Sequence, residues 1–491
     1  MASCSRLSVR VLIAVLVAST AQAQAQTPAA SQVSGDWLAT VTTSNVADFR
    51  VYLTAMRRGP NAYAAYSRPG ALRPFMSWRH YWIGRLLRKL PPQLSAVRLD
   101  SMTLRPAGDS TLLRGVFTSQ MLGTYQMYGS VRDDTLRAAL RADSAGRVLG
   151  SIQAVRSPNR ERLRDYAAIA QAIGDTMRAY VFDPRLMDTP AWRGFFGDIK
   201  ERFALARDDS DAMVAFYSQL PRLKTSHINL THDPRIANMS VDSALMRVSA
   251  PPESLVTLFF PAPGVAHLTV RRWHQVSDVI DSAFRRIVTA RAHSVILDIR
   301  GNPGGDQSGV TTSGHLFADS VYVGALLANR WYRDHDGPPT VQQWRSLPHS
   351  AKDDLLATFY ALREHGVVLG LVTPREPQFA GKVFLLVNGG TGSASEPLAH
   401  LLKQTGRATV VGERTAGAIL ASVPHSIGDG WVLVLPEADY YTAEGIRLEG
   451  RGVQPDVRTP WREALLAVAD SLRAQYPYAA ALVAVDRKSV V

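Results

Sequence analysis

The sequence is nearly without cysteine. Its one cysteine among 491 residues, Cys4, precedes the first long apolar run, whereas a lipid-modified cysteine would follow such a run. Once the N-terminal segment that contains Cys4 is removed, the chain contains no thiol. This excludes disulfides, cysteine nucleophiles and cysteine-based metal sites. The histidines offer no substitute, because the step from His227 to His232 is not a recognised zinc spacing. We therefore expect no metal and no cofactor.

Long apolar runs are equally scarce. A basic start leads into an apolar run at residues 11–17, and a small-x-small triplet follows at residues 21–23. This order is typical of a secretory signal peptide, which we place at residues 1–23. The run is short for a bilayer-spanning helix of roughly 20 residues, so an uncleaved anchor is the weaker interpretation. We expect export to the periplasm or the cell exterior, without stable membrane insertion.

Basic residues outnumber acidic ones, but the excess forms no block. The formal net charge is +13, and the arginines that produce it are scattered along the chain. Nucleic-acid binding needs a basic stripe or a recognised module, and the sequence contains neither. With 46% hydrophobic and 20% charged residues, the composition is that of a folded protein. The length is enough for two or three domains with cores of their own.

The patterning divides the first half of the chain into three segments. Residues 24–34 are rich in Ala, Gln, Ser and Thr and are predicted to be a linker. Residues 35–156 contain β-branched and aromatic stretches separated by turn signals, which predicts a small β-rich barrel or sandwich, crossed by a helix at residues 82–90. Residues 157–235 change to apolar spacings of three and four, and these predict a helical cap.

The last segment, residues 236–491, alternates strands and helices. Strands are predicted at residues 265–270, 294–299 and 383–387, and helices at residues 275–291 and 395–404. Continuous apolar strands between helices indicate a sheet buried on both faces, so this segment is predicted to be an α/β domain. A closing helix is expected to begin with Thr459 as its N-cap. Residues 316–380 show no pattern that assigns them.

A glycine-rich turn follows the strand at residues 294–299. Residues 298–305 have the sequence Asp-Ile-Arg-Gly-Asn-Pro-Gly-Gly, and taken alone they are best explained as a β-turn. A functional interpretation is also available, because paired glycines let backbone N–H groups converge on an anion. Gly304 and Gly305 are therefore candidates for an oxyanion hole.

A second glycine-rich turn, at residues 388–396, leaves a buried strand and enters a helix. Ser393 and Glu396 in this turn fit the Ser-x-x-Glu capping box, and we assign Glu396 to that structural role. The turn is not a Gly-x-Ser-x-Gly elbow, because Thr391 and Ser395 occupy the glycine positions. A strand-to-helix turn can nevertheless expose a nucleophile, and sequence geometry supports the two interpretations of Ser393 equally.

A third segment, at residues 225–229, contains Ser226 and His227. A lone histidine is more often a core or surface residue than a general base. The local sequence alone therefore favours no catalytic role for His227.

The order of these motifs resembles that of one protease family. Residues 298–305 and 386–396 are followed by residues 406–417 (Gly-Arg-Ala-Thr-Val-Val-Gly-Glu-Arg-Thr-Ala-Gly) and 449–456 (Glu-Gly-Arg-Gly-Val-Gln-Pro-Asp). Together they resemble the tail-specific (C-terminal processing) proteases, whose relatives include the tricorn core protease and interphotoreceptor retinoid-binding protein. The resemblance runs from about residue 160 to about residue 475. It implies a crotonase-like α/β domain with a helical cap, and a serine peptidase acting on peptides or unfolded proteins.

The resemblance also implies roles for single residues. Ser393 would be the nucleophile, and the N–H groups of Ala394 and of Gly304 or Gly305 would form the oxyanion hole. The lysine that the classical processing proteases use as general base is replaced here by Ala418.

The tricorn-like branch of the family uses another base. A Ser-His pair in the cap and a glutamate near the C-terminal motif replace the lysine, and Ser226, His227 and Glu449 match them. Glu444 in place of Glu449, or a purely structural role for Glu449, stays open. About 70 residues separate this pair from Asp298, which leaves no room for a PDZ domain of about 80 to 100 residues.

Two other functions are compatible with parts of the sequence. The missing lysine would suit a catalytically inactive peptide- or lipid-binding protein on the same fold. A crotonase-type acyl-CoA enzyme would share the fold, but CoA chemistry is cytosolic and the predicted signal peptide argues against it.

Overall fold

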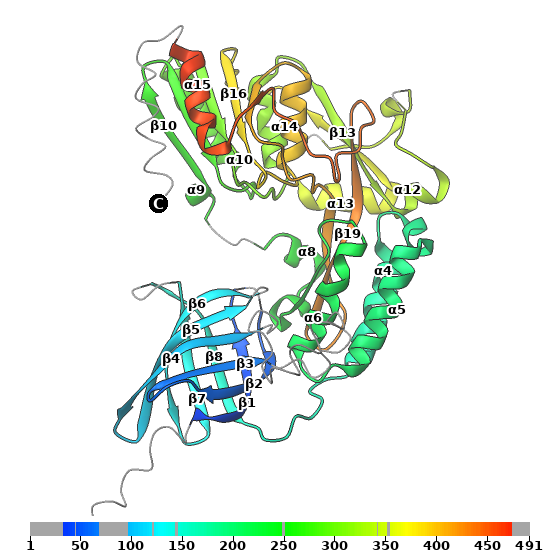
Figure 1. Ribbon diagram of the computed structural model, residues 1–491. Helices are drawn as coiled ribbons and strands as arrows, with labels where there is room; N and C mark the ends of the chain where they lie inside the picture. The colour runs from blue at the N-terminus through cyan, green and yellow to red at the C-terminus, as the bar shows by residue number, and fades with distance from the viewer. Residues whose placement is uncertain are drawn as a thin grey trace, which may run out of the picture.

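The structure, a computed structural model, describes residues 33–44, 46–67, 97–119, 122–142, 146–247, 251–340, 342–350 and 354–473. The signal peptide predicted at residues 1–23 and the helix predicted at residues 82–90 lie outside this part of the chain, as does all but the end of the predicted linker. A barrel, a helical segment and a larger α/β part follow one another along the chain (Figure 1).

An eight-stranded antiparallel barrel forms the N-terminal part. β1 pairs with both β2 and β8, so the sheet closes on itself and a barrel, rather than a sandwich, is formed. Alternate side chains of β1, including Trp37, Ala39 and Val41, are buried inside, as the period of two in a strand requires. The strands are β1 (Gly35–Thr42), β2 (Phe49–Arg57), β3 (Ala62–Ser67), β4 (Arg98–Ala107), β5 (Ser110–Ser119), β6 (Gly123–Arg132), β7 (Thr135–Arg141) and β8 (Val148–Arg156).

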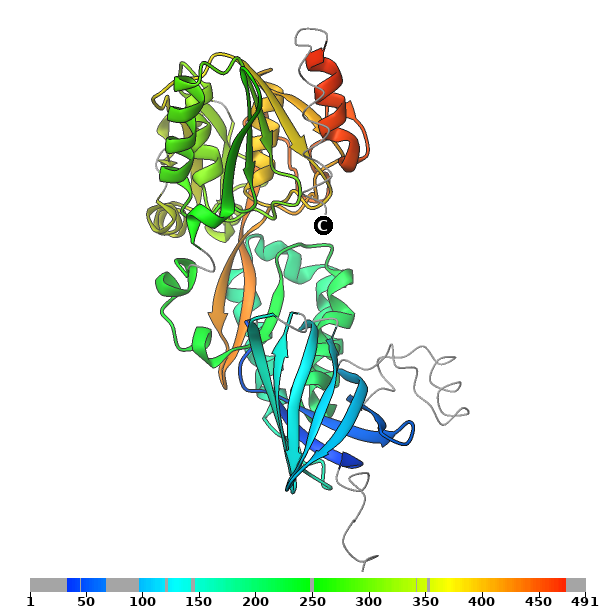
Figure 2. The same cartoon turned by 90° about the vertical axis from the view of Figure 1, so that its left-hand side faces the viewer.

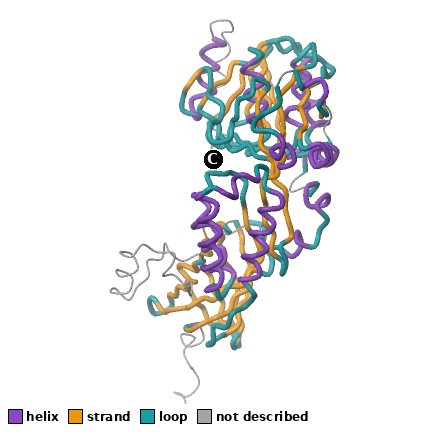
Figure 3. Tube along the Cα trace, turned by 90° about the vertical axis from the view of Figure 1, so that its right-hand side faces the viewer, coloured by secondary structure: helices purple, strands orange, loops and turns teal. Residues whose placement is uncertain are grey.

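Three helices follow, between the barrel and the α/β part (Figure 1, Figure 3). They are α4 (Tyr166–Tyr180), α5 (Pro190–Leu205) and α6 (Asp209–Gln219), with 3-10 turns η3 (Pro184–Asp188) and η4 (Leu220–Arg222). α4 begins where the Asp165 carboxylate accepts from the Ala168 N–H, and it buries a stripe that includes Ile169, Ile173 and Met177. The helical spacing in the sequence predicted this segment correctly.

The first sheet of the α/β part is mostly parallel and covered on both faces. Its order is β10 (Val256–Ala262), β11 (Val265–Val270), β12 (Ser294–Asp298), β16 (Lys382–Val387), β17 (Thr409–Gly412) and β20 (Val457–Arg458). One face packs against α10 (Ser277–Thr289) and α14 (Ser395–Gln404). The other packs against α15 (Ala464–Arg473). Burial on both faces explains why β11, β12 and β16 are continuous apolar runs, and these three strands are confirmed.

The second sheet contains the stretch that the sequence left unassigned. Its order is β14 (His349–Ser350), β15 (Val367–Val372), β13 (Val321–Ala328), β19 (Trp431–Thr442) and β18 (Ala421–Ser426), and β9 (Asn229–His232) pairs with β19. The remaining helices are short except α13: they are α7 (Pro234–Ala237), α8 (Val241–Leu245), α9 (Pro252–Leu255), α11 (Ser308–Thr312), η5 (Ser313–Leu316), α12 (Asn329–Asp334), η6 (Trp344–Ser346), α13 (Leu355–His365) and η7 (Trp461–Glu463).

One expected helix start is wrong. Thr459 was predicted to cap the closing helix, but α15 begins at Ala464 after the 3-10 turn η7, whose N-cap is Pro460. The Thr459 N–H donates instead to the Gly412 carbonyl, and the Trp461 N–H donates to Glu413 Oε1. These bonds extend the sheet edge past the expected cap, so the helix begins later.

The long strand β19 connects the helical segment with the α/β part (Figure 2). Its C-terminal half pairs with β13 and its N-terminal half pairs with β9, from Trp431↔His232 to Val434↔Asn229. The segment predicted as a separate cap therefore shares a sheet with the predicted catalytic part. Because a strand pairing fixes register, the residues just before β9 are held at a defined place beside the α/β part.

Buried carboxylates at the start of α6 join the helical segment to the barrel. Asp209 Oδ2 accepts from the Arg50 N–H at 2.7 Å, and Asp208 Oδ2 accepts from the Tyr52 N–H at 2.9 Å. Arg164 Nε donates to Asp209 Oδ1 at 2.9 Å, and the two side chains are 5% and 0% exposed. The barrel is thus held by a charged pair that water scarcely reaches.

Replacing one member of this pair should destabilise the protein strongly. Asp209→Ala leaves the Arg164 guanidinium buried without its main partner, and we expect a loss of about 3–5 kcal/mol in the free energy of unfolding. Asp175→Ala, which breaks the exposed Arg178–Asp175 pair, is the control and should cost about 0.5 kcal/mol or less. Urea unfolding followed by circular dichroism measures both, and equal losses would contradict the buried-pair argument.

Candidate active site

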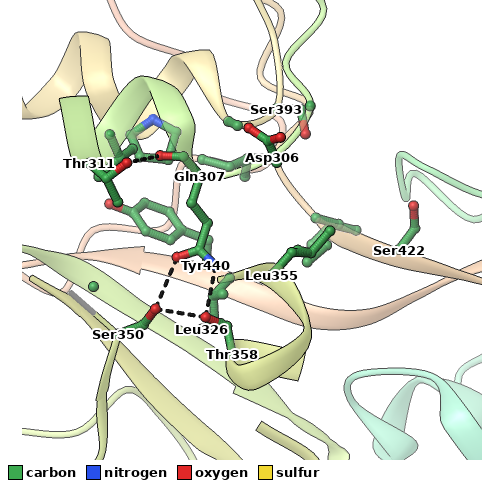
Figure 4. A pocket seen from close by; sticks show the side chains of 18 of the residues that line it. Asp306, Gln307, Thr311, Leu326, Ser350, Leu355, Thr358, Ser393, Ser422 and Tyr440 are labelled. Carbon is green, nitrogen blue, oxygen red and sulfur yellow. Dashed lines mark hydrogen bonds between the residues drawn. The ribbon is translucent and has the colours of Figure 1, made fainter. Parts of the chain in front are cut away.

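Ser393 lies in the turn between β16 and α14. Its φ is +51°, in the left-handed region that non-glycine residues rarely adopt. The Ser393 N–H donates to the Ala418 carbonyl at 2.7 Å, and this bond holds the turn. The side chain is half-buried and lines a cavity of about 490 Å³ (Figure 4). Strained backbone of this kind gathers at functional sites, because the surrounding structure must support it.

The turn at residues 298–305 packs directly against Ser393. A Cβ atom on Gly304 would lie 2.4 Å from Ser393 Cβ, and one on Gly305 would lie 1.6 Å from the Trp273 carbonyl oxygen. The two glycines are therefore required by close approach as well as by their positive φ values of 99° and 143°. This is the physical reason for a Gly-Gly pair at this place.

Hydrogen bonding distinguishes the two glycines. The Gly304 N–H donates to Asn302 Oδ1 at 2.9 Å. Among the described residues, the N–H groups of Gly305 and Ala394 donate no hydrogen bond. Of the two glycines that the sequence proposed, Gly305 is thus the one whose donor is available to a ligand, beside that of Ala394.

Glu449, Ser226 and His227 form a hydrogen-bonded chain. Glu449 accepts from the Ser226 N–H at Oε1 (2.8 Å) and from Ser226 Oγ at Oε2 (3.0 Å). Ser226 Oγ lies 2.7 Å from His227 Nδ1. Because the single hydroxyl hydrogen goes to the carboxylate, Nδ1 must carry the hydrogen in the other bond, which leaves the lone pair of His227 on Nε2.

His227 is placed for its neutral form. Burial lowers the pKa of His227 from its usual value of 6.5, and the negative charge of Glu449 opposes that shift in part. His227 also has a positive φ of 61° and lines the same cavity as Ser393. Within the part of the chain that the structure describes, no hydrogen bond joins Ser393 to His227; such bonds are often long before a substrate binds.

Glu444 and Glu449 contact different residues, and only Glu449 contacts Ser226. Glu444 Oε2 contacts His400 Nε2 at 2.9 Å, so it belongs to another ion pair. Glu449 contacts Ser226 and also accepts from the Ile419 N–H at 2.9 Å. The structure thus brings together Ser226, His227 and Glu449, as the sequence predicted.

The assignment of Glu396 to a helix cap is wrong. α14 has no side-chain cap bond, and the fully buried Glu396 carboxylate accepts instead from Thr415 Oγ1 (2.6 Å) and from the N–H groups of Gly417 (2.9 Å) and Ala418 (2.8 Å). Burial raises the pKa of Glu396, and these three donors oppose the shift. The carboxylate therefore holds the turn whose Ala418 carbonyl fixes Ser393. The local capping-box pattern did not predict these contacts, because they join Glu396 to residues about 20 positions further along the chain.

Asn302 is a structural residue of the site that the sequence did not single out. Its buried side chain donates to the Val270 carbonyl at 3.0 Å and accepts from the Gly304 N–H, while its own carbonyl accepts from the Gly392 N–H at 3.0 Å. Asn302 thus ties the two glycine-rich turns together. Its only sequence signal was its place in the Asn-Pro-Gly-Gly segment, from which the sequence singled out only the two glycines as functional candidates.

Two features are absent from the residues that the structure describes. No helix there is long and apolar enough to cross a membrane. No group of three or more His, Cys, Asp or Glu side chains there could hold a metal ion.

Known proteins resemble the α/β part. Residues 264–459 match peptidase family S41. A carboxy-terminal-processing protease of Bartonella bacilliformis is 27% identical over 191 residues, which cover 38% of this chain and 36% of that protein. A chloroplastic C-terminal processing peptidase of Tetradesmus obliquus is 40% identical over 176 residues, which cover 36% of this chain and 31% of that protein.

The matched region is about a third of the length of these curated relatives. Among solved structures, the tricorn protease aligns at 11% identity with a TM-score of 0.39, covering 90% of this chain and 54% of that one. The motif order and the family match agree on the same part of the chain. Residues 264–459 match peptidase family S41, and over this part of the chain the predicted relationship to the tail-specific (C-terminal processing) proteases is confirmed.

Proposed function

We propose that this protein is an exported serine peptidase that hydrolyses peptide bonds in peptides or unfolded proteins, with Ser393 as nucleophile and His227 as general base. The observation that carries the proposal is the chain Glu449–Ser226–His227, which ends at the cavity that Ser393 also lines. A serine hydroxyl is a weak nucleophile at neutral pH and needs a neighbouring base. The lone pair on His227 Nε2 supplies one.

The first chemical step forms an acyl-enzyme. His227 Nε2 removes the Ser393 hydroxyl proton while Ser393 Oγ attacks the scissile carbonyl carbon, and the carbonyl oxygen becomes an oxyanion. The N–H groups of Gly305 and Ala394 would hold this oxyanion. The C–N bond then breaks, and the proton on His227 passes to the leaving amine.

The second step restores the enzyme. His227 takes a proton from water, and the resulting hydroxide attacks the acyl carbon and displaces Ser393 Oγ, which regains its proton. In both steps Glu449 stabilises the transient imidazolium through Ser226. The methyl group of Ala418 cannot accept a proton, which supports His227 as the base.

The wider architecture is part of the proposal. We assign residues 236–491 to a crotonase-like domain and residues 157–235 to its cap, with a barrel at residues 35–156. From Asp233 to Asp298 the described elements are three short helices, the strands β10, β11 and β12, and α10, and these support the absence of a PDZ domain. Substrate selection would then depend on the cap, the 316–380 region or the barrel. Export rests on the signal peptide predicted at residues 1–23.

A second function has one observation in its favour. No hydrogen bond joins Ser393 to His227 among the described residues, as would suit a catalytically inactive peptide- or lipid-binding protein on the same fold. A reactive serine distinguishes the two functions, because only an activated hydroxyl attacks a fluorophosphonate.

Removing the Ser393 hydroxyl should abolish activity without unfolding the protein. We expect wild type to cleave casein and to be labelled by a fluorophosphonate, and Ser393→Ala to lose both by a factor of about 10³ or more, since the nucleophile is gone. Thermal unfolding of the two proteins should agree closely. Labelling that is absent from wild type and variant alike would favour the binding protein.

The pH profile should report His227. Only neutral His227 can accept a proton, so kcat/KM should fall on the acid side with a midpoint below 6.5, because burial lowers this pKa. Glu449→Gln removes the charge that raises the pKa of His227. We expect the midpoint to move to lower pH and the plateau rate to fall by about 10²-fold.

Glu444→Gln is the matched control for this profile. Glu444 pairs with His400 rather than with Ser226, so its replacement should leave the midpoint unchanged. An acid limb that is identical in wild type and Glu449→Gln would remove Glu449 from the mechanism.

A further inference from the structure

The cavity beside Ser393 has a polar end that the proposed mechanism does not use. Gln307 precedes α11, Ser350 belongs to β14 and Thr358 belongs to α13, and all three line the cavity (Figure 4). Gln307 Nε2 donates to Thr358 Oγ1 at 2.7 Å, and Ser350 Oγ donates to Gln307 Oε1 at 3.0 Å. Ser350 Oγ and Thr358 Oγ1 lie 2.7 Å apart. We call these three side chains the polar cluster.

Several apolar side chains line the cavity together with Ser393 and the polar cluster. They include Leu326, Leu355, Val368, Leu371 and Tyr440, of which Figure 4 labels Leu326, Leu355 and Tyr440. Tyr440 contributes its ring alone, because its hydroxyl already donates to the Val323 carbonyl at 2.8 Å. A slot with apolar walls and a polar end fits a side chain of the same character.

The cluster has few hydrogens left to give but several lone pairs. The two hydroxyl hydrogens of Ser350 and Thr358 serve three contacts: Ser350 Oγ with Gln307 Oε1, Ser350 Oγ with Thr358 Oγ1, and Thr358 Oγ1 with the Asp354 carbonyl at 2.9 Å. Gln307 Nε2 is used by Thr358 and lies 3.5 Å from the Asp354 carbonyl. At least one lone pair of Gln307 Oε1 and at least one of Ser350 Oγ remain whichever way these hydrogens are shared, so the end of the slot offers acceptors.

The carboxylate of Asp306, which also lines the cavity, does not change this character. Asp306 accepts from the Gln275 N–H (2.6 Å), the Ser308 N–H (3.0 Å) and Ser308 Oγ (2.5 Å). These bonds occupy most of its lone pairs. A lysine side chain in the slot would bring its charge among apolar walls and toward neutral acceptors, which is unfavourable.

We propose that this cavity is a specificity pocket for a tyrosine next to the scissile bond, an inference that rests on the proposed peptidase function. The tyrosine ring lies between the apolar walls, and its hydroxyl donates to Gln307 Oε1 or Ser350 Oγ. A volume of about 490 Å³ is ample for an aromatic side chain with adjoining backbone. Phenylalanine fills the same walls but leaves the acceptors without a donor.

The test compares peptides that differ only at the residue next to the cleaved bond. Full-length wild-type protein is given one peptide frame with Tyr, Phe, O-methyltyrosine, Leu or Lys at that position, and mass spectrometry identifies the cleaved bond. We expect kcat/KM for Tyr to exceed that for Phe by about 3- to 10-fold, the worth of one hydrogen bond. O-methyltyrosine keeps the ring and loses the donor, so it should be no better than Phe.

A variant removes the acceptors from the protein side. Gln307→Met with Ser350→Ala should lower the Tyr-to-Phe ratio to about one, while hydrolysis of the Phe peptide stays within about threefold of wild type and shows that the pocket is intact. Ser422→Ala removes another hydroxyl that lines the cavity away from the cluster, and it should keep the wild-type ratio.

The outcomes separate the two proposals. If wild type cleaves the Tyr and Phe peptides equally, or prefers Leu or Lys, the tyrosine pocket is wrong and the peptidase function stands. If wild type cleaves no peptide and takes up no fluorophosphonate, both proposals fail together. If the double variant keeps the wild-type Tyr-to-Phe ratio, the tyrosine hydroxyl donates to another group. The proposed role of the polar cluster is then wrong.

Discussion

The pairing of β9 with β19 is the contact on which the candidate site depends. β19 is a strand of the α/β part, and β9 brings the helical segment to its edge from Trp431↔His232 to Val434↔Asn229. The barrel reaches the same strand, because the Ala47 N–H donates to the His232 carbonyl at 2.9 Å. All three parts of the molecule meet at β9, and His227 lies just before it. The ladder therefore sets where His227 stands relative to Ser393.

A second constraint lies in the turn that follows Thr415. Three consecutive N–H groups of this turn are divided between two buried carboxylates: Gly417 and Ala418 donate to Glu396, and Ile419 donates to Glu449. Glu396 thereby holds the turn that supports the nucleophile, and Glu449 holds the Ser226–His227 pair. One short segment thus couples the two halves of the site. Buried carboxylates need such donors, since an unpaired charge in the interior is costly.

Local patterns predicted much of the fold. β11, β12, β16 and α14 were located within a residue or so, because a two-sided apolar environment leaves a continuous run and a covered helix leaves a stripe. The 316–380 region could not be assigned in the same way. β14 has two residues, the pairing of β13 with β15 has a register shift between Tyr322 and Gly324, and β13 finds its partners in β15 and β19, far along the chain. Their stability comes from those pairings more than from local periodicity.

The sequence by itself determined the residues that the site would need. The two glycine-rich turns, Ser393, the Ser226–His227 pair and Glu449 were all recognisable from motif order, and the substitution of Ala418 for lysine was visible as well. Only the tertiary structure decided which groups remain free to act. In the structure the Gly304 N–H donates to Asn302, and Glu396 binds the turn at residues 415–418 rather than capping a helix. Glu444 pairs with His400. The Glu396 and Glu444 contacts join residues far apart in sequence, and the Asn302 side chain that engages Gly304 also donates to the distant Val270 carbonyl, so no local pattern encodes this geometry.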